Sequence, residues 1–171
     1  MNKSKAKKFK KKLLSIESYY LAGIALAVSL LFKGGLFLSP AVAISAYFSW
    51  EIFRDDIKEY KVSHFSLTGL LVGGIGMAVA GAHFDVSILR GVIFFFIGWG
   101  MFQLFEGDIG GGDVRLVTVL AVFLNTVQIL SAISLAAALG MLIGSNLKLK
   151  RVAFGALIIA SAWLTFGIVR F

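Results

Sequence analysis

The sequence predicts an all-α fold, specifically a polytopic membrane protein with six to seven transmembrane helices. Of its 171 residues, 58% are hydrophobic and only 15% are charged, and the mean hydropathy is +0.89. Soluble domains are closer to half apolar and a quarter charged. Several apolar runs approach the roughly 20 residues that a helix needs to cross a bilayer. The alternating short strands of a membrane barrel are not visible.

Residues 1–35 are expected to form a basic cytoplasmic arm followed by an extra transmembrane helix. Seven of the first twelve residues are Lys, and an apolar run at 17–32 follows them. Lysines next to a span mark its cytoplasmic side and contact anionic lipid. Membrane lipids are therefore expected partners, and nucleic acid is not. The remaining residues, 36–171, are expected to be the core domain.

The core is expected to contain six helices separated by polar breaks. Thirty apolar residues at 114–143 exceed a single crossing, so we divide this run near Asn125–Gln128 into two helices, the first of them short. One long tilted helix is the alternative. The predicted helices cover about 36–53, 66–82, 88–105, the two parts of 114–143, and 152–169.

The basic residues predict the orientation of these helices. With the N-terminus in the cytoplasm, 14 of the 17 Lys and Arg residues fall on the cytoplasmic side, in agreement with the positive-inside rule. The charged loop 54–64 and the segment 106–116 then meet at the same membrane face. Four aspartates lie in these two segments: Asp55, Asp56, Asp108 and Asp113.

The segment 106–116 has the sequence Glu-Gly-Asp-Ile-Gly-Gly-Gly-Asp-Val-Arg-Leu. Each glycine costs about 1 kcal/mol relative to alanine inside a helix, so three in a row indicate a tight turn that another group can approach closely. Asp113 follows at the start of the next expected helix, where the helix dipole favours a negative charge. An ionisable residue at the edge of a span is a candidate functional group.

Two aspartates from separate segments would support acid–base chemistry. Close carboxylates share a proton, because their repulsion raises one pKa. The ionised partner can activate water while the protonated one donates to a carbonyl or a leaving amine. The alternative is that these aspartates are solvated loop charges. The chain has no Cys, and its two His, His64 and His83, lie on opposite sides of a predicted span; neither a metal nor another cofactor is expected.

These residues resemble the type IV prepilin and preflagellin peptidases, which are membrane aspartic proteases with a Gly-x-Gly-Asp motif. The family pattern Gly-x-Gly-Asp-x-Lys-Leu matches Gly110–Leu116, with Arg115 in place of Lys. The resemblance covers about 45–166, and the Gly-Asp motif is its most specific part.

Two further motifs match in part. The segment 56–64 follows the family order of an Asp, a short basic segment and an aliphatic residue before Pro-Asn. Val62 takes the aliphatic place, while Ser63 and His64 replace Pro and Asn. The family's Pro-Phe-Gly-Pro appears at 153–156 as Ala-Phe-Gly-Ala, without either proline.

The resemblance implies that Asp56 and Asp113 are the catalytic pair. The spacing to Val62 favours Asp56 over Asp55, and the preceding glycines favour Asp113 over Asp108. The residues implied to bind substrate or support the site are Gly110, Gly112, Arg115, Phe154 and Gly155. For Arg115, a plain basic anchor on the cytoplasmic side is the alternative.

The expected activity is removal of the basic leader from pilin-, pseudopilin- or flagellin-like precursors at the cytoplasmic face of a prokaryotic plasma membrane. Larger family members carry a Cys-bearing insert and also N-methylate their product. This chain lacks both Cys and the insert, so no methyltransferase activity is expected. The alternatives are an inactive assembly factor or transporter-like scaffold, and a presenilin-type protease. The latter carries a Pro-Ala-Leu motif, whereas the only Pro here, Pro40, precedes Ala41 and Val42. The sequence leaves the oligomeric state open.

Overall fold

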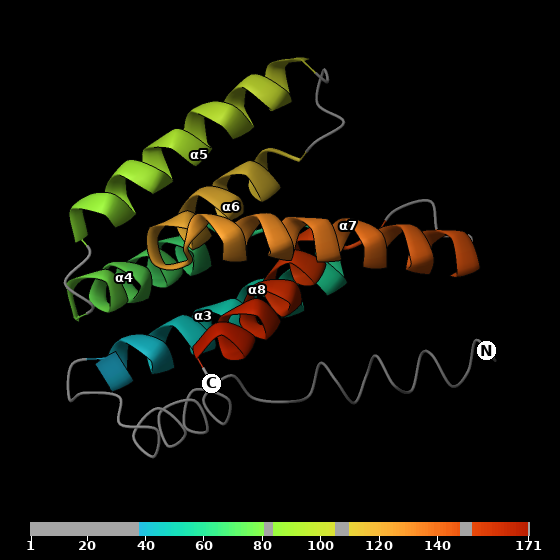
Figure 1. Cartoon of the computed structure of the whole chain (residues 1–171). Helices are drawn as coiled ribbons and strands as arrows, with labels where there is room; N and C mark the ends of the chain where they lie inside the picture. The colour runs from blue at the N-terminus through green and yellow to red at the C-terminus, as the bar shows by residue number, and fades with distance from the viewer. Residues whose placement is uncertain (1–37, 81–83, 105–109, 148–151, 171) are drawn as a thin grey trace.

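The computed structural model describes residues 38–80, 84–104, 110–147 and 152–170. Over these ranges the chain is helical and contains no strand, which confirms the predicted all-α fold (Figure 1). The predicted arm and extra helix at 1–35 lie outside the described residues. The helices are α3 (Leu38–Glu59), α4 (His64–Ala80), α5 (Phe84–Leu104), α6 (Gly111–Phe123), α7 (Thr126–Leu147) and α8 (Phe154–Arg170).

Two of these helices are long and apolar enough to cross a membrane. They are α5, with a mean hydropathy of 1.5, and the Thr126–Ser145 part of α7, with a mean hydropathy of 2.0. Only Ser87 and Gly91 of α5 are buried in the protein, so its large apolar side chains face outward along most of its length. A helix that is apolar on all sides and yet exposed is suited to lipid.

Helix α6 lies at the centre of the bundle. It packs against α5 on one side and against α4 and α8 on the other, and Figure 1 shows it between α5 and α7. Its residues Leu116 and Leu120 are almost completely buried, together with Ile52 of α3 and Ile158 of α8. The core therefore forms around the short helix that begins with the glycine-rich segment.

Glycines bring the backbones of α3 and α4 together, as small residues do between membrane helices. A Cβ atom at Gly73 would lie only 2.9 Å from the backbone nitrogen of Ser45, and one at Gly76 would lie 3.0 Å from the Cβ of Ala41. Larger residues at these two positions would force the helices apart.

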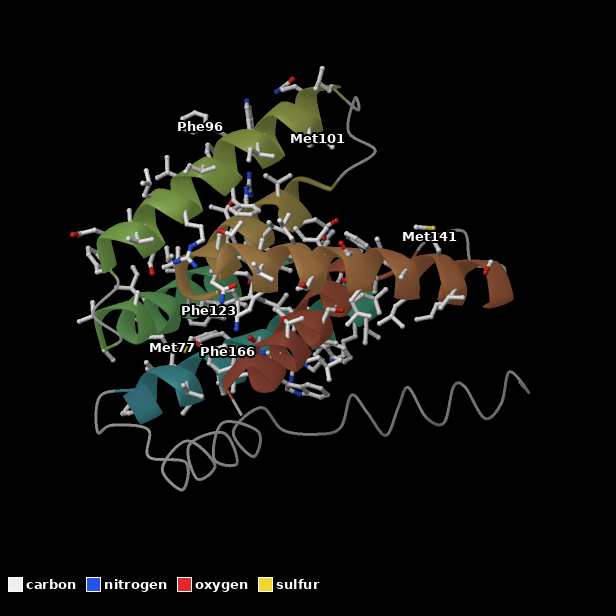
Figure 2. All side chains as sticks on the ribbon, viewed as in Figure 1. Met77, Phe96, Met101, Phe123, Met141 and Phe166 are labelled. Atoms are coloured by element: carbon white, nitrogen blue, oxygen red, sulfur yellow. The ribbon has the colours of Figure 1, made fainter. Side chains whose placement is uncertain are left out.

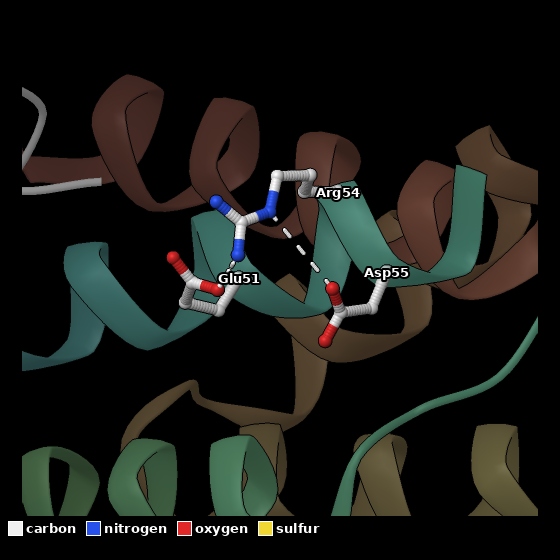
Figure 3. Close-up of polar contacts among 3 residues, drawn as sticks. All are labelled: Glu51, Arg54 and Asp55. Atoms are coloured by element: carbon white, nitrogen blue, oxygen red, sulfur yellow. Dashed lines mark hydrogen bonds and ion pairs between the residues drawn. The ribbon is translucent and has the colours of Figure 1, made fainter. Parts of the chain in front are cut away.

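The predicted end of α3 at Phe53 is wrong. The helix continues through Glu59, so the aspartates at its end lie on a helix instead of in a loop. Arg54 supports the additional turns by pairing with Glu51, and Figure 3 shows its guanidinium between Glu51 and Asp55. Tyr60 ends the helix with a positive φ of 55° and donates its N–H to the Asp56 carbonyl at 2.9 Å, which is a left-handed C-terminal cap.

The other predicted boundaries are within three residues of the observed ones, except that α5 begins at Phe84, four residues before the predicted start, and α7 ends at Leu147, four residues after the predicted end. The predicted division of 114–143 is confirmed, because α6 ends at Phe123 and α7 begins at Thr126. Asn125 N–H donates to Gln128 Oε1 at 2.9 Å, and Gln128 N–H donates to Asn125 Oδ1 at 2.8 Å. This reciprocal capping box starts a new helix, so the alternative of one long helix is wrong.

We predict that Asn125→Ala destabilises the protein by about 1 kcal/mol, because the first turn of α7 loses its side-chain acceptor. For a chain of this size the melting temperature should fall by roughly 2–4 °C, measured by thermal unfolding in detergent. Thr126→Ala, at the exposed neighbouring position, is the control. Equal melting temperatures for Asn125→Ala and the unmodified protein would contradict this role.

Candidate active site

Asp56 and Asp113 lie together, although they come from different helices. Asp56 is on the last turns of α3, and Asp113 is on the first turn of α6. Both carboxylates face Gly155 on the first turn of α8: a Cβ atom there would lie 3.2 Å from Asp56 Oδ2 and 3.4 Å from Asp113 Oδ1. Glycine at 155 therefore lets both carboxylates approach the start of α8 closely.

The N-terminus of α8 holds the Asp56 carboxylate. Ala156 N–H donates to Asp56 Oδ2 at 2.8 Å, and the backbone N–H of Gly155 also hydrogen-bonds this carboxylate. Asp56 is only 5% exposed. Free N–H groups and the positive end of the helix dipole stabilise an anion in this position.

Ala156 stands where the Pro-Phe-Gly-Pro pattern of the prepilin peptidases has its second proline. Proline has no N–H, so the hydrogen bond from residue 156 to Asp56 could not form if this position were proline. The substitution therefore adds a donor to the site.

The glycine-rich turn positions Asp113. Gly110 precedes α6, and its carbonyl accepts the N–H of Asp113 at 2.9 Å. A Cβ atom at Gly110 would lie 2.9 Å from Asp113 Oδ2, so the missing side chain leaves room for the carboxylate. Gly112 has a different contact, since a Cβ atom there would lie 3.4 Å from the Cβ and Cγ2 atoms of Val62. The segment that follows α3 thus packs directly beside Asp113.

The environments of the two carboxyls separate their proton affinities. Both lie outside the apolar spans, because Asp56 follows the run that ends at Phe53 and Asp113 precedes the run that starts at Val114. Burial, together with repulsion from Asp56, raises the pKa of Asp113 to about 6. Burial also raises the pKa of Asp56, but the N–H groups of Ala156 and Gly155 act in the opposite direction. Two such close carboxyls titrate as a pair, and the N–H groups at Asp56 favour its charged form.

Asp55 is not part of this arrangement. It lies beside Arg54, with 3.9 Å between Asp55 Oδ1 and Arg54 Nε, and a third of its side chain is exposed (Figure 3). Asp108, the other competing aspartate, lies outside the described residues. Of the alternatives in the sequence, the pair that the structure brings together is Asp56 with Asp113.

Arg115 contacts His64, and the sequence pattern does not predict this pairing. Its Nη1 atom lies 3.2 Å from His64 Nε2 and 3.4 Å from His64 Nδ1, which joins the start of α4 to the first turns of α6. Both side chains are exposed. The two residues are 51 positions apart in the sequence, so no local sequence pattern predicts their contact.

Phe154 packs its side chain between the hydrophobic core and α7. A Cβ atom at Gly140 of α7 would lie 3.8 Å from its ring. Its contribution is to fix the first turn of α8, and with it Gly155. Within the described residues, no group of three or more His, Cys, Asp or Glu side chains could hold a metal ion.

A comparison with protein families is consistent with this geometry. The model of the type IV leader peptidase family matches residues 43–145, a range that contains both aspartates and the glycine-rich turn. No curated protein and no solved structure matches the chain. The matched range exceeds half of the sequence, and the chain therefore belongs to the type IV leader peptidase family.

Proposed function

We propose that this chain is an aspartic endopeptidase that removes the basic leader from pilin-, pseudopilin- or flagellin-like precursors. It would act at the cytoplasmic face of a prokaryotic plasma membrane, as a multi-pass protein with its N-terminus in the cytoplasm. Membership of a leader peptidase family supports a protease of this kind. The observation that carries the aspartic mechanism is that the Asp56 and Asp113 carboxylates face the same point at Gly155.

The reaction follows from the single shared proton. Ionised Asp56 takes a proton from water, whose oxygen attacks the scissile carbonyl carbon, while protonated Asp113 donates to the carbonyl oxygen. The tetrahedral intermediate then collapses: Asp56 gives its proton to the amide nitrogen, Asp113 takes back a proton from a hydroxyl of the intermediate, and the C–N bond breaks. Water is consumed, and the products are a free carboxylate on the leader and a free amine on the mature protein.

Substrate recognition would depend on depth in the membrane. The apolar helix of the precursor would lie in lipid against the exposed faces of the bundle, which places the leader junction at the level of the aspartates. The chain contains no Cys, and we propose that it lacks the methyltransferase activity of the larger family members.

A second candidate is an inactive assembly factor that retains the scaffold. The changes to Ser63 and His64 in the first motif, and to Ala153 and Ala156 in the third, favour it. The experiments below separate the two candidates, because an inactive scaffold would cleave no precursor.

We predict that Asp56→Asn and Asp113→Asn each reduce kcat for leader removal on the order of 10²–10⁴-fold, the usual contribution of a general acid or base. The measurement co-expresses each variant with candidate precursors and follows the mass of the product. Asp55→Asn is the matched control from the same turn of α3, and Asp108→Asn is the control from the glycine-rich segment; both should keep the kcat of the unmodified enzyme. Full activity of either Asp56→Asn or Asp113→Asn would rule out the mechanism.

The pH dependence of kcat/KM should be bell-shaped. Activity falls on the alkaline side as Asp113 loses the shared proton, with an apparent pKa of about 6, and it falls on the acid side as Asp56 becomes protonated. Ala156→Pro removes the N–H that stabilises ionised Asp56, so the Asp56 pKa rises and the acid limb moves to higher pH. Proline is tolerated in the first turn of a helix.

Ala153→Pro is the control for this shift. It restores the other family proline without removing a hydrogen bond to Asp56, so the acid limb should stay where it is. An acid limb that is the same in Ala156→Pro and in the unmodified enzyme would show that this N–H does not tune Asp56.

We predict that neutralising four acidic residues in the two segments that carry Asp56 and Asp113 raises KM for a basic leader and leaves kcat nearly unchanged. Attraction of this kind is screened by salt, so the increase should be largest at low ionic strength. If the neutralised variant cleaves as the unmodified enzyme does at every salt concentration, these four residues do not attract the leader. The residues are Asp55 and Glu59 at the end of α3, and Glu106 and Asp108 in the glycine-rich segment.

A further inference from the structure

Arg90 is a cation on an apolar helix, and the proposed peptidase chemistry does not use it. Its guanidinium donates to the carbonyl of Leu124, the residue that follows α6, and lies 3.4 Å from Ser87 Oγ. Its Nε atom is buried without a hydrogen-bond partner. The ion pairs found among the described residues are those of Arg54, so the partners of Arg90 in this part of the chain are neutral.

A cavity of about 980 Å³ opens beside Arg90. It lies at the end of the bundle away from the aspartates, between α4, α5 and the break between α6 and α7. Most of its lining is apolar, and Figure 2 shows Met77, Phe123 and Phe166 close together on three different helices that line it. Its polar lining consists of Ser87, Arg90, Asn125, Thr126 and Gln128, with no carboxylate among the lining residues.

The break between α6 and α7 forms the polar part of this site. Asn125 and Thr126 are exposed and line the cavity, and irregular backbone is tolerated in a membrane protein where it lines a cavity. Arg90 donates to Leu124 next to the break, so the guanidinium belongs to this polar part, while the apolar lining extends from there along α5.

We propose that this cavity binds a membrane phospholipid with an anionic headgroup. The phosphate accepts hydrogen bonds from the Arg90 guanidinium, and the acyl chains fill the space along Ile93, Phe94 and Ile97. A cation within a span that has only neutral partners is stabilised by an anion, and arginine binds phosphate with short, charge-assisted hydrogen bonds. An apolar protein helix in the same cavity would bring no negative charge to Arg90, so charge complementarity favours the lipid.

The test measures the melting temperature of the purified full-length protein in neutral detergent. We expect phosphatidylglycerol at a hundredfold excess over its Kd to raise the melting temperature by roughly 5–10 °C. Phosphatidylcholine with the same acyl chains, and inorganic phosphate alone, should leave it within about 1 °C. Native mass spectrometry of the unmodified protein should retain about one phosphatidylglycerol per chain.

Arg90→Gln is the informative variant, because its amide can still donate to the Leu124 carbonyl while the charge is lost. It should lose most of the response to phosphatidylglycerol, whereas Lys61→Gln, which removes an exposed cation at the other end of the bundle, should keep it. An undiminished response in Arg90→Gln would overturn the proposal. So would an equal response of the unmodified protein to phosphatidylcholine, or to inorganic phosphate. These last two comparisons and the mass measurement use the unmodified protein, so they decide the matter even if Arg90→Gln does not fold, and none depends on peptidase activity.

Discussion

The arrangement of the bundle depends on one buried interaction, between the Asp56 carboxylate and the backbone N–H groups at the start of α8. An ionised carboxylate that is almost fully removed from water costs several kcal/mol unless it is paired or hydrogen-bonded. The N-terminus of α8 supplies that stabilisation from a residue 100 positions away in the sequence. This interaction fixes α3 against α8, and Gly155 at the same turn leaves room for Asp113 to approach from α6.

Two departures from the family pattern turn out to be neighbours. Arg115 stands where the family has Lys, and His64 stands where it has Asn, and their side chains are 3.2 Å apart. In the sequence they are two separate mismatches to the family pattern. In the structure they form one contact between α4 and α6. Ala156 also departs from the family pattern, which has proline there, and its N–H donates to Asp56.

Much of the fold and of the candidate site could be predicted from local signals. Apolar run lengths predicted the helices, and the glycines before Asp113 predicted a close approach that is observed at Gly110 and Gly112. Other features have no local signal. The charged end of α3 resembles a loop in sequence, but its helix persists until Tyr60 takes a left-handed conformation. The partner of Arg90 is a backbone carbonyl at Leu124, and residue types do not reveal which carbonyl a cation will reach.

The short length of α6 links the two ends of the molecule. With 13 residues it is about 20 Å long, and it has Asp113 in its first turn and the Leu124 carbonyl that accepts from Arg90 just past its last. The helix is therefore a rigid spacer with a fixed anchor at each end. A slip of a single residue along its axis would move both ends by about 1.5 Å. The distance from the Arg90–Leu124 hydrogen bond to Asp113 is thus set by the number of residues in α6.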